Sequence, residues 1–398
     1  MDGVLKNVYA RIAYLTACTL ADKCPDVSLL SGVSIDKIYQ AAKKHGMGAL
    51  VFSALEKVGL ATTEMRNDTN KVIRKIMLLD AEREAILAEL EREKIRYMPL
   101  KGVIIKELYP KIGLREMTDN DILFDESERE RVRDIFSARG YDIKFYGLNL
   151  SHDVYIKEPV YNYEMHVSLL RPLALGDEML EFFDGSMDRS LPDGNSEYRR
   201  RMTEEEFYLF MKVHEYKHYT LSGIGLRLFA DTFVFLNAYG DKLDFEYVDA
   251  LCEKMGISDY ESTSRSLAMK LMDVDTARRL CLGESSVLTD KELDLFSYCS
   301  FSGAYGLISQ EVENGIKRLE DEGKKRGFLK LRYILRRLFP KERYYEIRFP
   351  FAYKHKWARP FVLLRRFFRT LIRAPKRIIV PFITVIKYKG DNKNGKRK

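Results

Sequence analysis

Two carboxylates stand close together in residues 114–130, which read LREMTDNDILFDESERE. Asp119 and Asp121 lie two residues apart at the start of an apolar run. In a β-strand alternate side chains share a face, so both carboxylates would point one way while Ile122 and Phe124 point into the opposite layer. Paired carboxylates on a mostly buried strand repel each other and lose hydration, so they need a cation. A divalent metal ion is the usual solution, and a solvated turn before a strand is the plainer interpretation.

A later segment, YNYEMHVSLL, supplies a candidate third ligand. Alternation gives it an apolar face and a polar face, and the polar face carries Glu164 and His166. If this strand neighbours the strand with Asp119 and Asp121, Glu164 completes a three-carboxylate cluster. Such a cluster suits Mg²⁺, which prefers oxygen ligands and keeps waters and substrate phosphates in its shell. Exposure of Glu164 on an edge strand and a structural hydrogen bond for His166 are the plainer alternatives.

The elements before these residues are expected to be mainly helical. Residues 1–65 read as packed helices, with Ser34 as an N-cap and Gly59 as a stop. A long charged helix is expected over 70–95. RYMPLKG then reads as a short strand that ends in a turn at Gly102, before helical spacing resumes as far as a proline.

The following elements alternate between strand and helix. DNDILF and the region near DIKFYG are expected to be strands, with a charged helix over 126–139 and a turn at Gly140 between them. HDVYIK and YNYEMHVSLL are separated by EPV, which suits a hairpin or a short strand connection. Helical spacing returns over 203–323.

An ordered series of motifs resembles a known family. MPLKGVIIKELYP, LREMTDNDILF, RGYDIKF and YNYEMHVSLL look like the uncharacterised nucleotidyltransferase family of the DNA polymerase beta-like superfamily. FMKVHEYKHYTLSGIGLRLFADTFVFL is similar to the family's His-rich helix, glycine turn and Arg-x-x-x-Asp helix. The resemblance covers roughly residues 30–290. It implies an α/β (α+β) fold, in which a polymerase-beta-like mixed sheet is flanked by helices.

The resemblance also implies roles for the carboxylates. Asp119 and Asp121 would bind two metal ions, Mg²⁺ or Mn²⁺, and Glu164 would be the third carboxylate and a candidate base. In two-metal chemistry one ion lowers the pKa of the attacking hydroxyl and the other neutralises the leaving pyrophosphate. One residue departs from the pattern: Asn120 stands where an Ile or Leu is usual, so its amide is either hydrogen-bonded behind the strand or loosens it.

Nucleotide contacts are expected from residues outside the carboxylate cluster. Lys101 and Gly102 occupy the turn where the wider superfamily has Gly-Ser, at a helix N-terminus suited to phosphate. The resemblance puts Arg115 at the triphosphate. His166 and Lys217 are further candidates for contact with the nucleotide.

The segment HEYKH offers a competing interpretation. His214 and His218 are four residues apart with Glu215 between them, which matches the short zinc-protease pattern. No third ligand follows, and the family resemblance explains both histidines, so a metalloprotease is not favoured. Arg227 and Asp231, also four residues apart, are interpreted first as a helix ion pair and second as part of a substrate cleft.

Charge divides the chain in two. Residues 324–398 carry 25 basic and three acidic residues, whereas the rest of the chain carries 42 basic and 56 acidic ones. The basic segment mixes Arg and Lys with Phe, Leu and Ile at spacings that suit amphipathic helices, which bind anionic membrane surfaces. RNA binding and packing on the acidic body are the alternatives. The membrane is favoured because aliphatic residues and Phe outnumber Tyr.

The remaining composition bounds the class of protein. Five cysteines without a Cys-x-x-Cys pair read as reduced thiols of a cytosolic protein. The N-terminus has an acidic residue at position 2 and Arg11 in its apolar region, which argues against a signal peptide. No uncharged apolar run of about 18 residues is present, so no membrane-spanning helix is expected. The predicted location is cytoplasmic, peripheral at the inner face of the membrane.

These observations predict four regions and one activity. The regions are a helical part (1–95), a catalytic core (96–172), a helical domain completing the cleft (173–323) and a basic amphipathic tail (324–398). The activity is transfer of a nucleoside monophosphate from an NTP to an unknown hydroxyl acceptor, which could be a small molecule, a protein or RNA, with release of pyrophosphate. The alternatives are a toxin-like RNA-modifying nucleotidyltransferase and a catalytically silent scaffold at the membrane surface.

Overall fold

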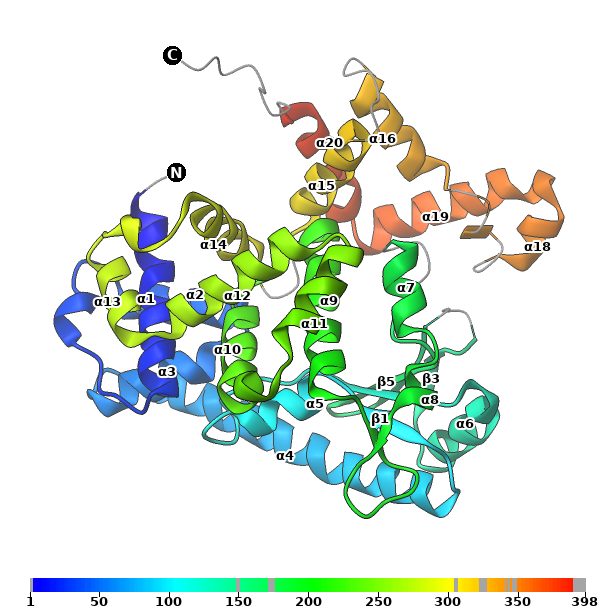
Figure 1. Cartoon of the computed structure of the whole chain (residues 1–398). Coiled ribbons are helices and arrows are strands. Elements are labelled where there is room, and N and C mark those ends of the chain that lie inside the picture. The colour runs from blue at the N-terminus through cyan, green and yellow to red at the C-terminus, as the bar shows by residue number, and fades with distance from the viewer. Residues whose placement is uncertain are drawn as a thin grey trace. The chain divides into compact units, whose positions relative to one another are not determined.

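The computed structural model groups the chain into two compact units (Figure 1). It describes residues 3–147, 151–170, 176–303, 307–321, 328–340, 342, 344–345 and 349–388. The first unit contains residues 1–217 and 225–304, and the second contains 218–224 and 305–398. The four predicted regions stay a prediction.

The first unit begins with helices: α1 (Gly3–Leu20), η1 (Val27–Leu30), α2 (Ile35–Lys44), α3 (Gly48–Lys57) and α4 (Thr63–Arg92). The segment expected to run from Ser34 to Gly59 is divided between α2 and α3, because Gly46 has a φ of +64° that a helix interior does not allow. The long charged helix starts earlier than its apolar pattern indicates. Thr62 caps α4 by accepting a hydrogen bond from the Met65 N–H.

A five-stranded mixed sheet follows, in the order β1-β2-β5-β4-β3. Its strands are β1 (Tyr97–Pro99), β2 (Asn120–Phe124), β3 (Asp142–Phe145), β4 (His152–Lys157) and β5 (Tyr161–His166). β2 and β5 are parallel, and the other neighbouring pairs are antiparallel. β4 and β5 form the expected hairpin. Between these strands lie α5 (Gly102–Ile105), η2 (Lys106–Leu108), η3 (Glu126–Glu128) and α6 (Arg129–Ala138).

One face of the sheet is covered by α4 and α6. Ile122, Tyr163 and Met165 of the sheet pack with Leu87 of α4 and Phe136 of α6 in one buried apolar cluster. Figure 1 shows the long α4 running beside the sheet. Because strand side chains alternate, the residues between these apolar ones point to the opposite face.

Helices complete the first unit, together with a two-stranded ribbon. The ribbon consists of β6 (Leu191–Pro192) and β7 (Arg200–Arg201). The helices are α7 (Asp177–Phe183), α8 (Ser186–Arg189), α9 (Glu204–Leu221), α10 (Arg227–Tyr239), η4 (Gly240–Lys242), α11 (Phe245–Lys254), α12 (Ser258–Met272), α13 (Val274–Cys281), η5 (Ser285–Val287) and α14 (Asp290–Ser302). The last residues of α9 belong to the second unit. All five cysteines are free thiols in the structure. The helix-flanked mixed sheet confirms the predicted fold class.

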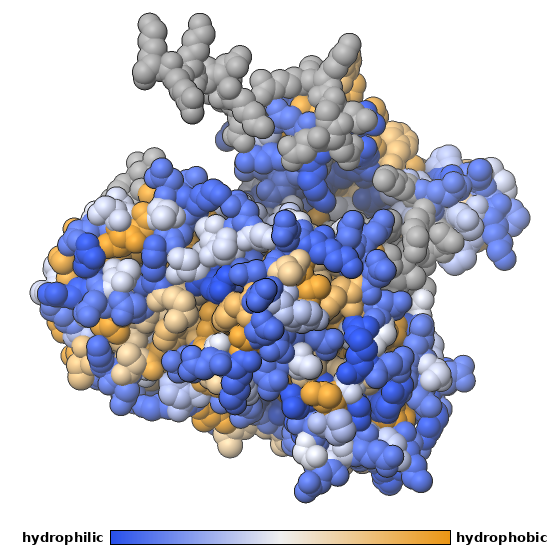
Figure 2. All heavy atoms as spheres, viewed as in Figure 1, coloured by the Kyte–Doolittle hydropathy of each residue, from blue (hydrophilic) through white to orange (hydrophobic). Residues whose placement is uncertain are grey.

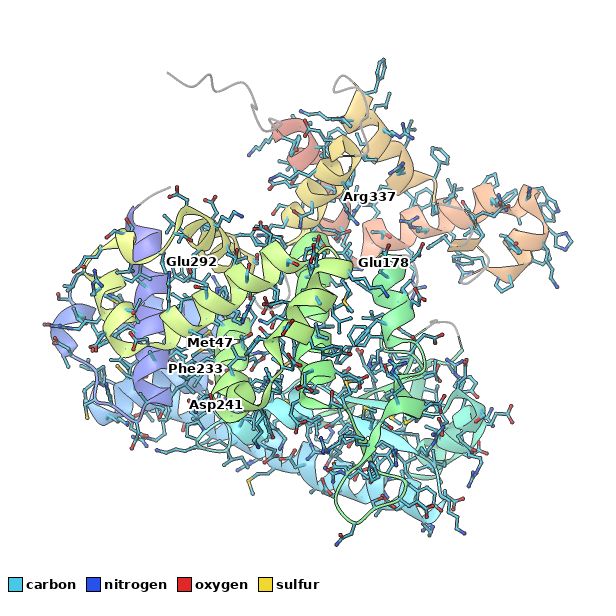
Figure 3. All side chains as sticks on the ribbon, in the orientation of Figure 1. Met47, Glu178, Phe233, Asp241, Glu292 and Arg337 are labelled. Carbon is cyan, nitrogen blue, oxygen red and sulfur yellow. The ribbon has the colours of Figure 1, made fainter. Side chains whose placement is uncertain are left out.

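The second unit is helical. Its elements are α15 (Ile308–Asp321), α16 (Leu329–Leu338), α18 (Pro350–Lys354), η7 (Lys356–Ala358), α19 (Arg359–Arg373) and α20 (Lys376–Lys387). Val312, Ile316 and Leu319 of α15 pack with Leu329 and with Val385 of α20. Arg337 of α16, labelled in Figure 3, lies 3.2 Å from a carboxylate oxygen of Glu311 on α15. Among the described helices, none is long and apolar enough to cross a bilayer.

Candidate active site

The strand register brings the predicted carboxylates to adjacent strands. In the parallel pairing of β2 with β5, Asp121 stands opposite Glu164 and Leu123 stands opposite His166. In the antiparallel pairing of β4 with β5, His152 stands opposite His166. Residues opposite each other share a face of the sheet, so Asp121, Glu164, His166 and His152 form one polar group. This group lies on the face opposite the cluster formed with α4 and α6.

Asp121 is the best-connected carboxylate of this group. Its Oδ1 lies 2.9 Å from Nε2 of His166, and its Oδ2 lies 3.7 Å from Nζ of Lys101. Burial acts to raise the pKa of Asp121, but the charge of Lys101 and the hydrogen bond with His166 outweigh it, so the pKa lies below its ordinary value. Asp121 is therefore ionised at neutral pH.

The pKa values of Asp119 and Glu164 are raised, in contrast to that of Asp121. Asp119 immediately precedes β2 and accepts a hydrogen bond of 3.1 Å from the Thr118 hydroxyl. Burial, followed by the charge of Asp121, raises the pKa of Asp119. Burial also raises the pKa of Glu164, with further contributions from Asp121 and Asp119. The three carboxylates thus carry more negative charge than the nearby Lys101 offsets, which is the electrostatic setting that a divalent cation relieves.

His152 was not among the predicted site residues. Its Nε2 lies 3.4 Å from Oε2 of Glu164, and Nε2 of His166 lies 3.9 Å from the same oxygen. One potential ligand atom each from His152, Glu164 and His166 lies within 4.8 Å of the other two. The sequence held a signal for this residue, since counting back from the turn of the β4–β5 hairpin sets His152 opposite His166.

Lys101 forms the turn between β1 and α5. Its φ is +36°, a region that residues other than glycine rarely adopt. The side chain is mostly buried, and its Nζ lies 5.5 Å from the ring centre of Phe210 on α9. A non-glycine residue held at positive φ indicates a position that the surrounding structure fixes, which is common at functional sites.

Gly102 allows a close approach by Arg115. A Cβ atom on Gly102 would lie 2.7 Å from Nη1 of Arg115 and 3.0 Å from Sδ of Met117. The structure therefore needs glycine here for packing, in addition to the role that the resemblance implies.

Arg115 is buried and paired with α10. Its Nε and Nη2 donate to the two carboxylate oxygens of Asp231 at 2.8 and 2.9 Å, and the Tyr109 hydroxyl donates to Asp231 at 2.8 Å. The expected helix pair between Arg227 and Asp231 is looser, at 4.0 Å. The partner of Asp231 that matters most is thus 116 residues away in the chain, and sequence spacing did not indicate it.

Asn120 is hydrogen-bonded behind the strand. Its Oδ1 accepts from Nη1 of Arg83 on α4 at 3.3 Å, and Arg83 is also paired with Asp80 at 2.6 Å. Within the described residues, Nδ2 of Asn120 and Nδ1 of His166 are buried polar atoms without a hydrogen-bond partner. The amide of Asn120 is thus hydrogen-bonded through its oxygen only, as the first of the two expectations describes in part.

The zinc-protease pattern does not supply a free base. Glu215 is buried, and its carboxylate accepts from Nζ of Lys212 at 2.9 Å and from the Thr232 hydroxyl at 3.3 Å. The group of potential metal ligands that the described residues form does not include His214 or His218. Lys217 lies on α9 with a partly buried side chain.

Comparisons with known proteins show which family this chain resembles. No curated protein and no solved structure matches the chain significantly. Residues 31–273, more than half of the chain, match the family described as uncharacterised nucleotidyltransferase. The matched range includes the sheet, the polar group on β2, β4 and β5, and the pair between Arg115 and Asp231. This chain belongs to the uncharacterised nucleotidyltransferase family, and that membership supports a nucleotidyltransferase activity.

Proposed function

We propose that the protein transfers a nucleoside monophosphate from an NTP to a hydroxyl acceptor and releases pyrophosphate. The observation that carries this proposal is the parallel register of β2 and β5, which aligns Asp121 with Glu164 in a chain of this family. In the reaction the acceptor oxygen bonds to the α-phosphorus, the bond between the α-phosphorus and the bridging oxygen breaks, and pyrophosphate leaves.

The donor set fits a divalent cation. Asp119, Asp121 and Glu164 would hold Mg²⁺ or Mn²⁺, because oxygen ligands of this kind suit both ions. The raised pKa values of Asp119 and Glu164 support this assignment, since a nearby cation would relieve the repulsion that contributes to both shifts. When bound, the ions would lower the pKa of the acceptor hydroxyl and offset the charge of the leaving pyrophosphate.

Glu164 would accept the proton of the acceptor hydroxyl. Its side chain is only partly buried, which would leave a carboxylate oxygen accessible to a bound acceptor. Asp121 stays ionised beside Lys101, and His166 holds its carboxylate in place. These residues position charge before the nucleotide arrives, which is the main protein contribution to this class of reaction.

The remaining candidates would contact the nucleotide. Lys101 and the Gly102 turn would meet the phosphates, and His166 stays a candidate for contact with the nucleotide. Arg115 and Lys217 also stay candidates for contact with the triphosphate. The pairing of Arg115 with Asp231 favours an indirect role for Arg115, in which it supports the Gly102 turn.

A labelling experiment tests the proposed transfer. Purified protein is incubated with each α-³²P-labelled NTP and Mg²⁺, with and without cell lysate, and the label is followed. Transfer to a lysate component or to the protein itself is expected, and it should be lost in Asp119→Asn and Asp121→Asn. Asp142→Asn is the matched control, because Asp142 is an exposed carboxylate on β3 of the same sheet. Equal labelling by all three variants would overturn the proposed site.

We also propose that the second unit binds an anionic membrane surface. One face of α19 presents Phe361, Leu364, Phe368, Leu371 and Ile372 at helical spacing, each at least 44% exposed. Arg365, Arg366 and Arg369 lie along the same helix. Figure 2 shows hydrophobic residues also reaching the surface along α16, where Leu331, Leu335 and Leu338 are exposed.

The net charge of residues 324–398 argues for anionic lipid as the occupant of this surface. A segment with 25 basic and three acidic residues is attracted to anionic headgroups, while the apolar face gains from burial among the acyl chains. The same location would make the protein peripheral at the inner face of the membrane.

Vesicle co-sedimentation tests the membrane proposal. Binding to vesicles with anionic lipid is expected to exceed binding to neutral vesicles and to weaken as salt rises. Phe361→Ser combined with Ile372→Ser should reduce binding, whereas Leu282→Ser, at an exposed leucine of the first unit, should not. If the protein did not bind anionic vesicles but bound RNA in a salt-dependent way, the membrane proposal would be wrong and RNA would be the partner of the second unit.

A further inference from the structure

Two histidines flank Glu164 on the polar face of the sheet. His152 is supplied by β4, whereas Glu164 and His166 are supplied by β5. One potential ligand atom from each lies within 4.8 Å of the other two, so a single ion could contact all three residues.

The two imidazoles are held in place by the hairpin. His152 and His166 stand directly opposite each other in the antiparallel register, both are buried, and their ring centres are 4.9 Å apart. The Ser151 hydroxyl lies 3.1 Å from Nδ1 of His152. A hydrogen bond at one ring nitrogen fixes the orientation of the other as a ligand, a common arrangement around metal-binding histidines.

The negative charge of Asp121 adds to this arrangement. Its Oδ1 lies 2.9 Å from Nε2 of His166, and that nitrogen lies 3.9 Å from Oε2 of Glu164. A bound cation would replace the proton of the hydrogen bond between Nε2 of His166 and Oδ1 of Asp121. The carboxylate of Asp121 would then lie next to the ion and offset part of its charge.

The chemistry of the donors selects the kind of ion. Two imidazole nitrogens and one carboxylate suit ions of borderline softness, whereas Mg²⁺ prefers an all-oxygen set. Zinc sites with two histidines, one glutamate and an open position are known among catalytic metal centres. A site made of carboxylates alone would not favour a borderline ion such as Zn²⁺ in this way.

We propose that His152, Glu164 and His166 bind a divalent transition-metal ion, represented by Zn²⁺, beside the oxygen site of Asp119 and Asp121. The catalytic meaning of this ion rests on the proposed function, because Glu164 is shared between the two sites. Binding of the ion itself does not depend on that function. The nucleotidyl-transfer site would then be mixed, with one hard ion and one borderline ion.

Equilibrium binding to the full chain tests this site without any nucleotide. The protein is stripped with chelator and titrated with Zn²⁺ by calorimetry in excess Mg²⁺. Co²⁺ is used in parallel, because binding at a four-coordinate site gives it intense visible absorption bands. Wild-type protein is expected to bind one equivalent of Zn²⁺ that Mg²⁺ does not displace. His152→Ala and His166→Ala should each weaken binding at least about tenfold and remove the Co²⁺ bands, since each loses one of three ligands.

His355→Ala is the matched control, because His355 is an exposed histidine of the second unit. Its Zn²⁺ affinity should equal that of wild type. Failure of wild-type protein to bind Zn²⁺ in excess Mg²⁺, or equal binding by folded His152→Ala, would overturn the site. Zn²⁺ binding without label transfer would contradict the proposed function but not the Zn²⁺ site. Label transfer in Mg²⁺ without Zn²⁺ binding would contradict the Zn²⁺ site but not the proposed function.

Discussion

The carboxylates of the site differ in proton affinity because their neighbours differ. Lys101 and His166 keep Asp121 ionised, whereas burial and repulsion raise the pKa values of Asp119 and Glu164. A group whose pKa is raised in the folded state stabilises the fold only when it is protonated, and this contribution is lost as pH rises through the folded pKa. Asp119 therefore weakens the fold at neutral pH in the absence of a cation.

Replacing Asp119 by Asn should separate stability from activity. Without metal, Asp119→Asn is expected to stabilise the protein at pH 7 by about 1 kcal/mol, because it removes a repelled buried charge. Label transfer should be lost in the same variant. Thermal unfolding in chelator measures the first effect, with Asp142→Asn as the neutral control. A variant less stable than wild type would contradict this account of Asp119.

The affinity for Mg²⁺ should depend on pH. Protons compete with the ion for Asp119 and Glu164, and both pKa values are raised. Affinity is thus expected to fall as pH decreases, starting above the ordinary carboxyl range of roughly 4. Calorimetric titrations between pH 5 and 8, with circular dichroism to check folding, measure this. Constant affinity down to about pH 5 would contradict the raised pKa values of both carboxylates.

Residue alternation pointed to three candidate site residues. The spacing of Asp119 and Asp121, and the polar face with Glu164, are local properties of two strands. The partner of Arg115 was missed because Asp231 is distant in sequence, and its nearer neighbour Arg227 offered an obvious helix pair. His152 was missed because it lies at the start of β4, and only the register of the β4–β5 hairpin puts it opposite His166.

At the scale of elements, the turn after β1 depends on glycine. A methyl group at Gly102 would lie 2.7 Å from Nη1 of Arg115, so the guanidinium held by Asp231 would have to move. Gly102→Ala is expected to destabilise the protein by about 1–3 kcal/mol, as overpacking does. Gly240→Ala, whose Cβ would make only an ordinary contact with Leu236, is the matched control. Chemical denaturation compares them, and equal stability would show that the turn adapts.

The buried pair between Arg115 and α10 joins the turn to the helical part of the first unit. Asp231→Asn should cost about 3–5 kcal/mol, because it leaves the Arg115 charge buried without its counter-ion. Arg227→Gln should cost less, about 1–2 kcal/mol, since it loses a partly exposed 4.0 Å ion pair and one 3.1 Å hydrogen bond to the Glu116 carbonyl. Denaturant unfolding of both variants measures the difference. Similar costs would contradict the assignment of Arg115 as the main partner of Asp231.

Element types were more predictable than their pairing. Apolar alternation indicated the strands, and Ser34, Gly59 and Gly140 indicated three helix limits, whereas 203–323 was predicted only as helical and holds several separate helices. The order β1-β2-β5-β4-β3 was not accessible, because insertion of β5 beside β2 is a long-range choice that local spacing does not encode. The expected third carboxylate was therefore conditional until β2 and β5 proved to be neighbours.

At the scale of the whole molecule, charge and chemistry are divided between the two units. The polar group of β2, β4 and β5 belongs to the first unit, and most of the basic residues after position 323 belong to the second. Composition indicated a basic segment over 324–398, whereas the second unit begins at residue 305 and also includes 218–224. The acceptor was not predictable, because the shape of a binding site depends on side chains supplied by many elements.

The most direct test of the proposed transfer compares two positions of the label. Parallel reactions contain the same NTP labelled with ³²P at either the α- or the γ-phosphate, with Mg²⁺ and lysate as the source of acceptor. Nucleotidyl transfer predicts that α-label enters the acceptor while γ-label is released as pyrophosphate, and that Asp121→Asn abolishes both. Entry of γ-label into the acceptor, or unchanged transfer by Asp121→Asn, would contradict the proposed reaction and its site.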